Sequence, residues 1–198
     1  MKDTKQILLE ATYKELYHHG YQGTSLSKIL TSSGLTKGAL YHYYKSKKEI
    51  ALETISVMIG SFVQNYWEEP AQNTPNPYAT LFELIENLPS TTIDNEPFID
   101  TKHGCFLNNL IQEMSPLDEN FACLLQSLYE RFENSVLLLL TKAQEKNELK
   151  KEIDVQGLAI FITTTIEASI SLAKVKNDIE YFHISSKHIR AYVDLLNK

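Results

Sequence analysis

The chain has 198 residues, and 43% of them are hydrophobic, which is typical of a folded globular protein and excludes an intrinsically disordered one. It contains no uninterrupted apolar run of about 18 residues and no signal peptide at its start, so we expect a cytoplasmic protein without a membrane span. Two cysteines are too few for a disulfide framework. The net charge of −6 divides unevenly, because residues 1–48 hold eight lysines and three acids, a charge of +5, and leave −11 for the remainder. A basic segment joined to an acidic body suggests a nucleic-acid-binding region with a separate second domain.

The basic segment has the pattern of a helix-turn-helix. Apolar spacing predicts a first helix over residues 3–19, which Gly20 ends. Two short helices follow from Thr24 to Lys47. Ser25 caps the first, Gly34 makes the turn between them, and Thr36 caps the second. A short, capped second helix with polar flanks is suited to reading DNA bases, although an ordinary helical corner with a solvated basic face is the alternative. The expected DNA contacts are Thr24, Ser25, Ser27, Thr36, Lys37, Gly38, Tyr41, His42, Lys45 and Lys47.

This segment also carries a resemblance to a known family. The residues Thr36-Lys37-Gly38-Ala39-Leu40-Tyr41-His42-Tyr43-Tyr44-Lys45-Ser46-Lys47, with Gly20-Tyr21 and Ser33-Gly34 before them, resemble the TetR/AcrR family of bacterial transcriptional regulators. The resemblance covers roughly the first quarter of the chain, and Tyr44 stands where the family more often has phenylalanine.

The resemblance implies an all-α fold of about nine helices. It places a three-helix DNA-binding domain at residues 1–48 and a helical domain for effector binding and dimerisation at residues 49–198. It further implies a homodimer on a palindromic double-stranded operator, a small-molecule effector, no cofactor, no metal and no enzymatic activity. Members of this family are mostly repressors.

The rest of the chain reads as further helices separated by loops. Apolar periodicity predicts helices over residues 47–68, 78–88, 105–114, from a cap at Ser115 to about 146, 155–176 and 186–196. Three prolines predict a loop over residues 70–77, and prolines with acids predict an irregular loop over residues 89–102, in which Phe98 and Ile99 pack inward. We find no strand pattern.

The middle helices are expected to enclose a ligand pocket rich in aromatic side chains, although ordinary core packing is the alternative for each residue and aromatic-rich helical cores are common. No constellation of charges identifies the ligand. The expected lining residues are Phe62, Tyr66, Trp67, Phe82, Cys105, Phe106, Leu110, Met114, Phe132 and Phe161.

Cys105 is a candidate sensor. The run Gly104-Cys105-Phe106-Leu107 is similar to a Gly-Cys-Leu segment in one branch of the resembled family, in which some members respond to reactive electrophiles through a cysteine. A cysteine at a helix N-terminus is favoured as the thiolate, the nucleophilic form. Lys174 is a possible cationic neighbour, by resemblance. The alternative is a buried, inert cysteine, and Cys123 is expected to be structural.

The last two helices carry a long apolar stripe that either packs within the chain or pairs with a second copy. In the resembled family these helices usually form a four-helix bundle with their twins, which favours an interface between copies. The expected interface residues are Phe161, Ile162, Ile166, Ile170, Tyr192 and Val193.

Two other classes of function stay open: a small all-helical enzyme and a protein–protein adaptor without DNA binding. The chain has no HExxH motif, zinc-ligand spacing, phosphate-binding glycine loop or nucleophile elbow. Glu113, Glu167 and His103 are scattered along the chain, as residues of solvated helix faces are. The basic segment argues against an adaptor. The sequence does not identify the operator, the effector or the regulated gene, and it does not distinguish a repressor from an activator.

Overall fold

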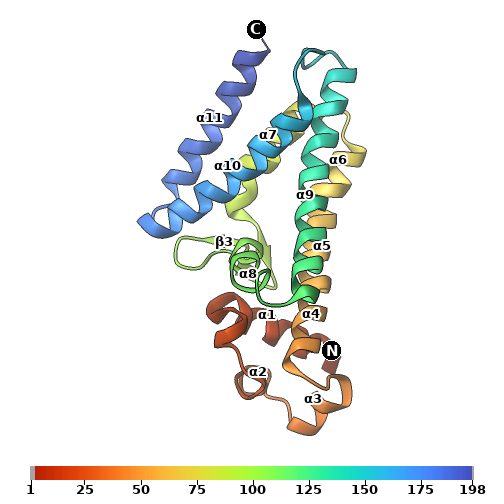
Figure 1. Ribbon diagram of the computed structural model, residues 1–198, viewed down its shortest axis with the longest axis vertical. Coiled ribbons are helices and arrows are strands. Elements are labelled where there is room, and N and C mark those ends of the chain that lie inside the picture. The colour runs from red at the N-terminus through yellow and green to blue at the C-terminus, as the bar shows by residue number, and fades with distance from the viewer. Residues whose placement is uncertain (1–2, 198) are drawn as a thin grey trace.

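The computed structural model describes residues 3–197 and consists almost entirely of helices (Figure 1). Three helices form a head at one end of the molecule: α1 (Thr4–Gly23), α2 (Leu26–Ser33) and α3 (Lys37–Tyr43). The hydroxyls of Ser25 and Thr36 accept hydrogen bonds from first-turn backbone N–H groups of α2 and α3, so both predicted caps are confirmed. The C-terminus lies at the opposite end of the molecule from this head.

Two glycines shape the head. Gly20 has a φ of 67° and a ψ of 180°, which kinks α1 at the predicted end and leaves residues 21–23 as a short additional turn. The positive φ favours glycine, and a Cβ atom at this position would lie 2.6 Å from a carboxylate oxygen of Glu113, so another residue would also displace that side chain. Gly34 adopts the left-handed conformation, with a φ of 67°, and ends α2.

A long helical rod leaves the head and runs along the body (Figure 1). Its segments are α4 (Lys47–Thr54), a π-helical stretch (Ile55–Ile59), α5 (Gly60–Phe62), a second π-helical stretch (Val63–Glu68) and α6 (Glu69–Asn73). The predicted loop from Pro70 is therefore wrong over its first half. Pro70 is accommodated in the first turn of α6, beside π-helical turns whose altered hydrogen bonding tolerates a missing N–H group.

Short strands occupy the segment predicted to be an irregular loop. After α7 (Pro77–Asn87) and a 3₁₀ turn (Leu88–Ser90), β1 (Thr92–Ile93) pairs antiparallel with β2 (Glu96–Pro97), and β3 (Ile99–Asp100) pairs antiparallel with β4 (Gly104–Cys105). The expectation of no strands is wrong, because two-residue strands are too short to show an alternating pattern. Phe98 and Ile99 are buried, as predicted.

Four helices complete the body: α8 (Phe106–Met114), α9 (Glu119–Glu145), α10 (Val155–Lys176) and α11 (Glu180–Leu196). Asp118, not Ser115, caps α9; Ser115 ends α8 instead. The last helix begins at Glu180 rather than near Ser186, because Asn177 in the left-handed conformation ends α10 abruptly and the chain turns at once. With the rod counted once, the described residues form nine helices and a 3₁₀ turn, which confirms the all-α fold.

Buried apolar side chains form two clusters. The smaller cluster lies in the head and contains Leu8, Leu9, Ala11, Ile29, Leu40, Tyr44 and Ile50. The larger cluster fills the body and reaches α1 through Tyr13, Leu16 and Tyr17. One face of α1 therefore packs on the head and another on the body, so this helix joins the two cores.

By length and composition alone, α10 is apolar enough to cross a membrane. In its most apolar stretch, 44% of the residues are buried inside the protein, and the helix packs against both α9 and α11. A core helix of a soluble protein has the same properties.

Candidate functional site

The exposed face of the head gathers most of the predicted DNA contacts. Eight of the ten are exposed: Ser25, Ser27, Thr36, Lys37, Gly38, Tyr41, His42 and Lys45. Four of these lie on α3, where the Lys37 ammonium is 5.7 Å from the centre of the Tyr41 ring. The helix presents cations, hydroxyls and aromatic edges to solvent over about two turns, which suits contact with phosphates and base edges. DNA contact by these residues stays a prediction.

The other two predicted contacts face inward. Thr24 is buried, and its hydroxyl donates to the carbonyl oxygen of Gly20. The Lys47 ammonium donates to the carbonyl oxygens of Tyr21, at 2.9 Å, and Thr24, at 3.0 Å, and lies 4.1 Å from the centre of the Tyr21 ring. The expectation of free side chains at these positions is corrected: Lys47 holds α4 to the end of α1.

Two exposed residues of the head lie beside the predicted DNA contacts but are not among those that the sequence predicted. Lys28 lies on α2, and Tyr43 lies on α3, 40% exposed. The Lys28 ammonium reaches the carbonyl oxygen of Gly23 at 2.9 Å. The signal that would have found them is their type and place: a lysine and a tyrosine within the helix-turn-helix segment itself.

Polar contacts tie the head to the body. The carboxylate of Glu113 on α8 accepts hydrogen bonds from the backbone N–H groups of Tyr21, at 2.9 Å, and Gln22, at 2.6 Å. The Lys48 ammonium, in the first turn of α4, lies 2.7 Å from the carboxylate of Asp118, which caps α9. Glu113 was expected on a solvated face, but it is a half-buried link between the head and the body.

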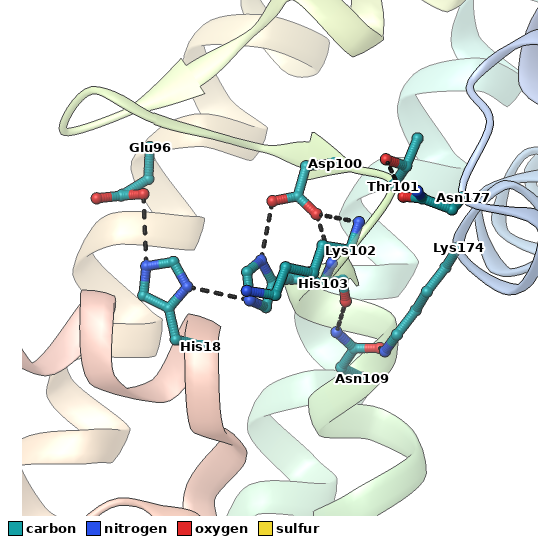
Figure 2. Close-up of polar contacts among 9 residues, drawn as sticks. All are labelled: His18, Glu96, Asp100, Thr101, Lys102, His103, Asn109, Lys174 and Asn177. Carbon is teal, nitrogen blue, oxygen red and sulfur yellow. Dashed lines mark hydrogen bonds and ion pairs between the residues drawn. The ribbon is translucent and has the colours of Figure 1, made fainter.

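A second junction joins α1 to the strands (Figure 2). The rings of His18 and His103 meet with 3.3 Å between Nδ1 and Nε2, and each also contacts a carboxylate: Glu96 at 3.6 Å and Asp100 at 2.9 Å. Burial acts to raise the pKa of Asp100, but hydrogen bonds from His103 outweigh it and lower the pKa. Within the described residues, no group of three or more His, Cys, Asp or Glu is arranged to hold a metal ion.

The strand segment is tied to the body as well as to α1. Asn109 on α8 donates to the carbonyl oxygen of His103, and Thr101 contacts Asn177 at the end of α10 (Figure 2). Lys174 lies 3.3 Å from the amide oxygen of Asn109. Its ammonium is thus used in this polar network, and the structure gives it no contact with the sulfur of Cys105.

The predicted pocket does not form as one site. Phe62, Trp67 and Phe132 line an inner cavity of only about 10 Å³, too small for a ligand. Tyr66 and Phe161 line two separate surface grooves. The remaining five predicted lining residues are core side chains: Phe82, Cys105, Phe106, Leu110 and Met114.

Cys105 is buried, and the thiolate expected at its helix N-terminus is contradicted. Burial raises the pKa of the thiol well above its ordinary value, and the neighbouring Glu167 raises it further, whereas backbone N–H groups of α8 lower it less. The sulfur donates to a carboxylate oxygen of Glu167 at 3.6 Å. The helix dipole is outweighed because the sulfur lies among apolar side chains beside an acid. Cys123 is exposed.

A larger cleft, of about 720 Å³, opens between α8, α9 and α10. Glu167 lines both this cleft and the inner cavity, and burial raises its pKa to about 7. The expectation of a solvated Glu167 is therefore wrong. The signal available in the sequence was a single charged residue inside an otherwise uncharged stretch, Ile160 to Ala173.

Four of the six predicted interface residues face the core. Ile162, Ile166, Ile170 and Val193 are buried within the chain, because α10 and α11 turn these residues toward their neighbours in the body. Phe161 and Tyr192 are exposed, and their ring centres lie 5.2 Å apart. The exposed apolar residues of these helices are Ile160, Phe161, Leu172, Val175, Ile184, Tyr192 and Leu195.

Comparisons with known proteins agree with this geometry. Residues 8–54 match the family model of bacterial regulatory proteins of the tetR family, and residues 84–189 match the tetracyclin repressor-like C-terminal domain. The chain is 29% identical over 182 residues to an uncharacterized HTH-type transcriptional regulator of Lactococcus lactis subsp. lactis, covering 90% of this chain and 87% of that protein. It is 25% identical over 198 residues to the HTH-type transcriptional repressor ComR of Escherichia coli K12, covering 97% and 90%. The solved regulatory protein TetR from Rhodobacter sphaeroides shares the fold, with a TM-score of 0.79, 24% identity and coverage of 94% and 97%.

Proposed function

Because this chain belongs to the TetR family of bacterial regulatory proteins and is a DNA-binding transcriptional regulator, we propose that it is a repressor that leaves its operator when a small molecule binds its helical body. The relatives it matches are regulators, which agrees with a function other than catalysis. Repression is proposed because two of these relatives are named repressors. The proposed setting is the bacterial cytoplasm, where the operator DNA lies.

The exposed face of α3 is the observation that carries the proposal. We assign DNA binding to residues 1–48 and effector binding and dimerisation to residues 49–198. Lys37, Gly38, Tyr41 and His42 would enter the major groove, with Ser25, Ser27, Lys28 and Lys45 at the flanking phosphates. The internal caps of α2 and α3 support this role, because they hold the reading helix at a constant angle.

A homodimer would present two such heads to a palindromic operator. The exposed apolar residues of α10 and α11, among them Phe161, Val175 and Tyr192, support this assembly, since large exposed apolar patches are commonly interfaces. The buried residues Ile162, Ile166 and Ile170 would support that face from inside the chain, by packing α10 rigidly against the body.

The links between the body and the head offer a route for release. Glu113 on α8 holds the end of α1, and Asp118 at the start of α9 holds Lys48 of α4. A ligand that displaces α8 relative to α9 would therefore shift α1 relative to α4 and tilt the head. The two α3 helices of the dimer would change their separation and lose the match to the half-sites. A coupling free energy of about 1–3 kcal/mol is enough to lower operator affinity by one or two orders of magnitude.

The test is a titration of labelled DNA from the promoter nearest the gene, with a random fragment of equal length as the reference. The double variant Lys37→Ala/Tyr41→Ala is expected to lose the preference for promoter DNA by on the order of 100-fold, because each base contact contributes ~1–3 kcal/mol. Lys151→Ala, a lysine on the exposed loop before α10, should bind like the wild type. An unchanged preference in the double variant would remove α3 from the recognition surface.

A further inference from the structure

The cleft between α8, α9 and α10 is large enough for a small organic molecule. Its volume of about 720 Å³ lies within the range of about 300–1,000 Å³ that is common for ligand sites. Figure 1 shows α10 crossing the body beside α9, above α8. The lining residues are Asn108, Ile111, Gln112, Ser115, Ala122, Gln126, Tyr129, Glu130, Glu133, Thr164, Glu167, Ala168 and Ser171.

The charges of this lining are all negative. It contains three carboxylates, Glu130, Glu133 and Glu167, and no lysine, arginine or histidine. Arg131 on the same stretch of α9 faces away, where its guanidinium binds Glu68 at 2.7 Å. The cleft therefore favours a positively charged ligand and disfavours an anion.

Glu167 is the half-buried member of this set and lacks a partner of opposite charge. One of its carboxylate oxygens accepts from the Cys105 sulfur at 3.6 Å, and the other, Oε2, is buried without a hydrogen-bond partner. A buried, unpaired carboxylate is costly, and the arrival of a cation offsets that cost. Oε2 of Glu167 can therefore accept a hydrogen bond or bind a cation, and the described residues supply neither.

Aromatic rings line both cavities that Glu167 borders. Tyr129 lines the cleft, and Trp67 and Phe132 line the inner cavity. The centre of the Phe132 ring lies 6.0 Å from that of Tyr129 and 4.6 Å from that of Trp67. Ring faces attract cations, and most strongly where water is excluded. An acid set among aromatic rings recognises an organic cation better than a hydrated metal ion.

We propose that this cleft binds a lipophilic organic cation, with Glu167 as its counter-ion and Tyr129 as its aromatic wall. The effect of such a ligand on DNA rests on the proposed function, whereas its binding does not. The cleft wall on α8, at Asn108 and Gln112, belongs to the helix whose Glu113 holds the end of α1. Occupation of the cleft would displace this helix and loosen the head.

The test uses two probes of matched shape and opposite charge, tetraphenylphosphonium and tetraphenylborate, with isothermal titration calorimetry on the full chain. The wild type is expected to bind the cation at least about tenfold more tightly than the anion, since ~1.4 kcal/mol of charge preference gives that ratio. Glu167→Gln should lose this preference. The matched control Glu145→Gln removes an exposed acid of α9 outside the cleft and should keep it.

A second variant covers the case in which Glu167→Gln fails to fold. Ala168→Trp fills the cleft from an exposed position of α10, so it should abolish binding of the cation without disturbing the core. Equal binding of both probes by the wild type, or undiminished binding by Ala168→Trp, would overturn the site.

Promoter DNA titrated with and without tetraphenylphosphonium separates this site from the proposed function. Binding of the cation with a fall in DNA affinity supports both. Binding of the cation without any change in DNA affinity supports the site and contradicts its role as the effector site. Failure of the cation to bind a protein that still prefers promoter DNA overturns the site and leaves the DNA-binding function standing.

Discussion

The head and the cleft place their candidate functional residues by different means. The exposed residues of α2 and α3 lie within one stretch of 24 residues, from Thr24 to Lys47, and short-range caps and turns orient them. The cleft draws on three helices between Asn108 and Ser171, and its central acid is buried by packing. A surface made from one short segment can be altered without unfolding the chain, whereas a site made by packing couples binding to stability.

The largest expected effect compares the buried and exposed faces of α10. Ile166→Glu places a carboxylate in the core of the body, and the chain should lose at least about 4 kcal/mol of unfolding free energy or fail to fold. Val175→Glu alters a residue that is 78% exposed, so it should keep the fold and weaken the dimer. Urea denaturation and light scattering measure the two. A folded dimer of Ile166→Glu would mean that the buried face of α10 is misassigned.

The next effect concerns the pH dependence that Glu167 adds to stability. The carboxyl has a pKa of about 7 in the folded chain, against 4.5 for the exposed group, so the folded state binds more protons between these values. Stability contributed by this group is therefore complete below pH 4.5 and falls as the pH rises to about 7. Cys105 and Tyr129, which face it, stay protonated in this window because burial raises the pKa of both.

Glu167→Gln should remove this fall. Relative to the wild type, it should gain about 3 kcal/mol of unfolding free energy between pH 4 and pH 8, since one pKa unit corresponds to about 1.4 kcal/mol. Denaturation curves across this range measure the difference. Glu133→Gln, which removes another carboxylate of the cleft, should follow the wild-type slope. A wild-type slope in Glu167→Gln would contradict the burial of its carboxyl group.

A smaller effect is expected at the joint between the head and the body. Glu113→Gln replaces two carboxylate acceptors by one neutral oxygen, so one of the N–H groups of Tyr21 and Gln22 loses its partner. The cost should be about 2 kcal/mol of unfolding free energy. It should also reduce the effect of a bound ligand on DNA affinity, which a paired titration measures. An undiminished ligand effect would show that release follows another route.

The smallest effect compares two neighbouring lysines of the head. Lys47→Met removes a contact with two carbonyl oxygens and a ring, at a cost of about 1 kcal/mol of stability, and should leave the salt dependence of DNA binding unchanged. Lys45→Ala should leave stability unchanged and lower the slope of log affinity against log salt by about one. A lower salt slope in Lys47→Met, with an unchanged slope in Lys45→Ala, would show that Lys47 contacts a phosphate.

Local chemistry in the sequence determined the head and most of the helices. Ser25, Gly34 and Thr36 act within a few residues of themselves, so caps and turns are readable without any knowledge of packing. The helices from α7 to α10 follow for the same reason, because their apolar spacing is regular over many residues.

Tertiary structure alone decided which face of a helix is covered. The sequence shows α10 apolar on nearly all sides, and only its contacts with α9 and α11 assign Ile166 to the core and Val175 to the surface. The same holds for charges: Lys47, Glu113 and Glu167 look solvated in sequence, yet each is directed inward by a segment distant along the chain. Burial depends on the summed positions of several helices, and a pattern within one helix cannot contain that information.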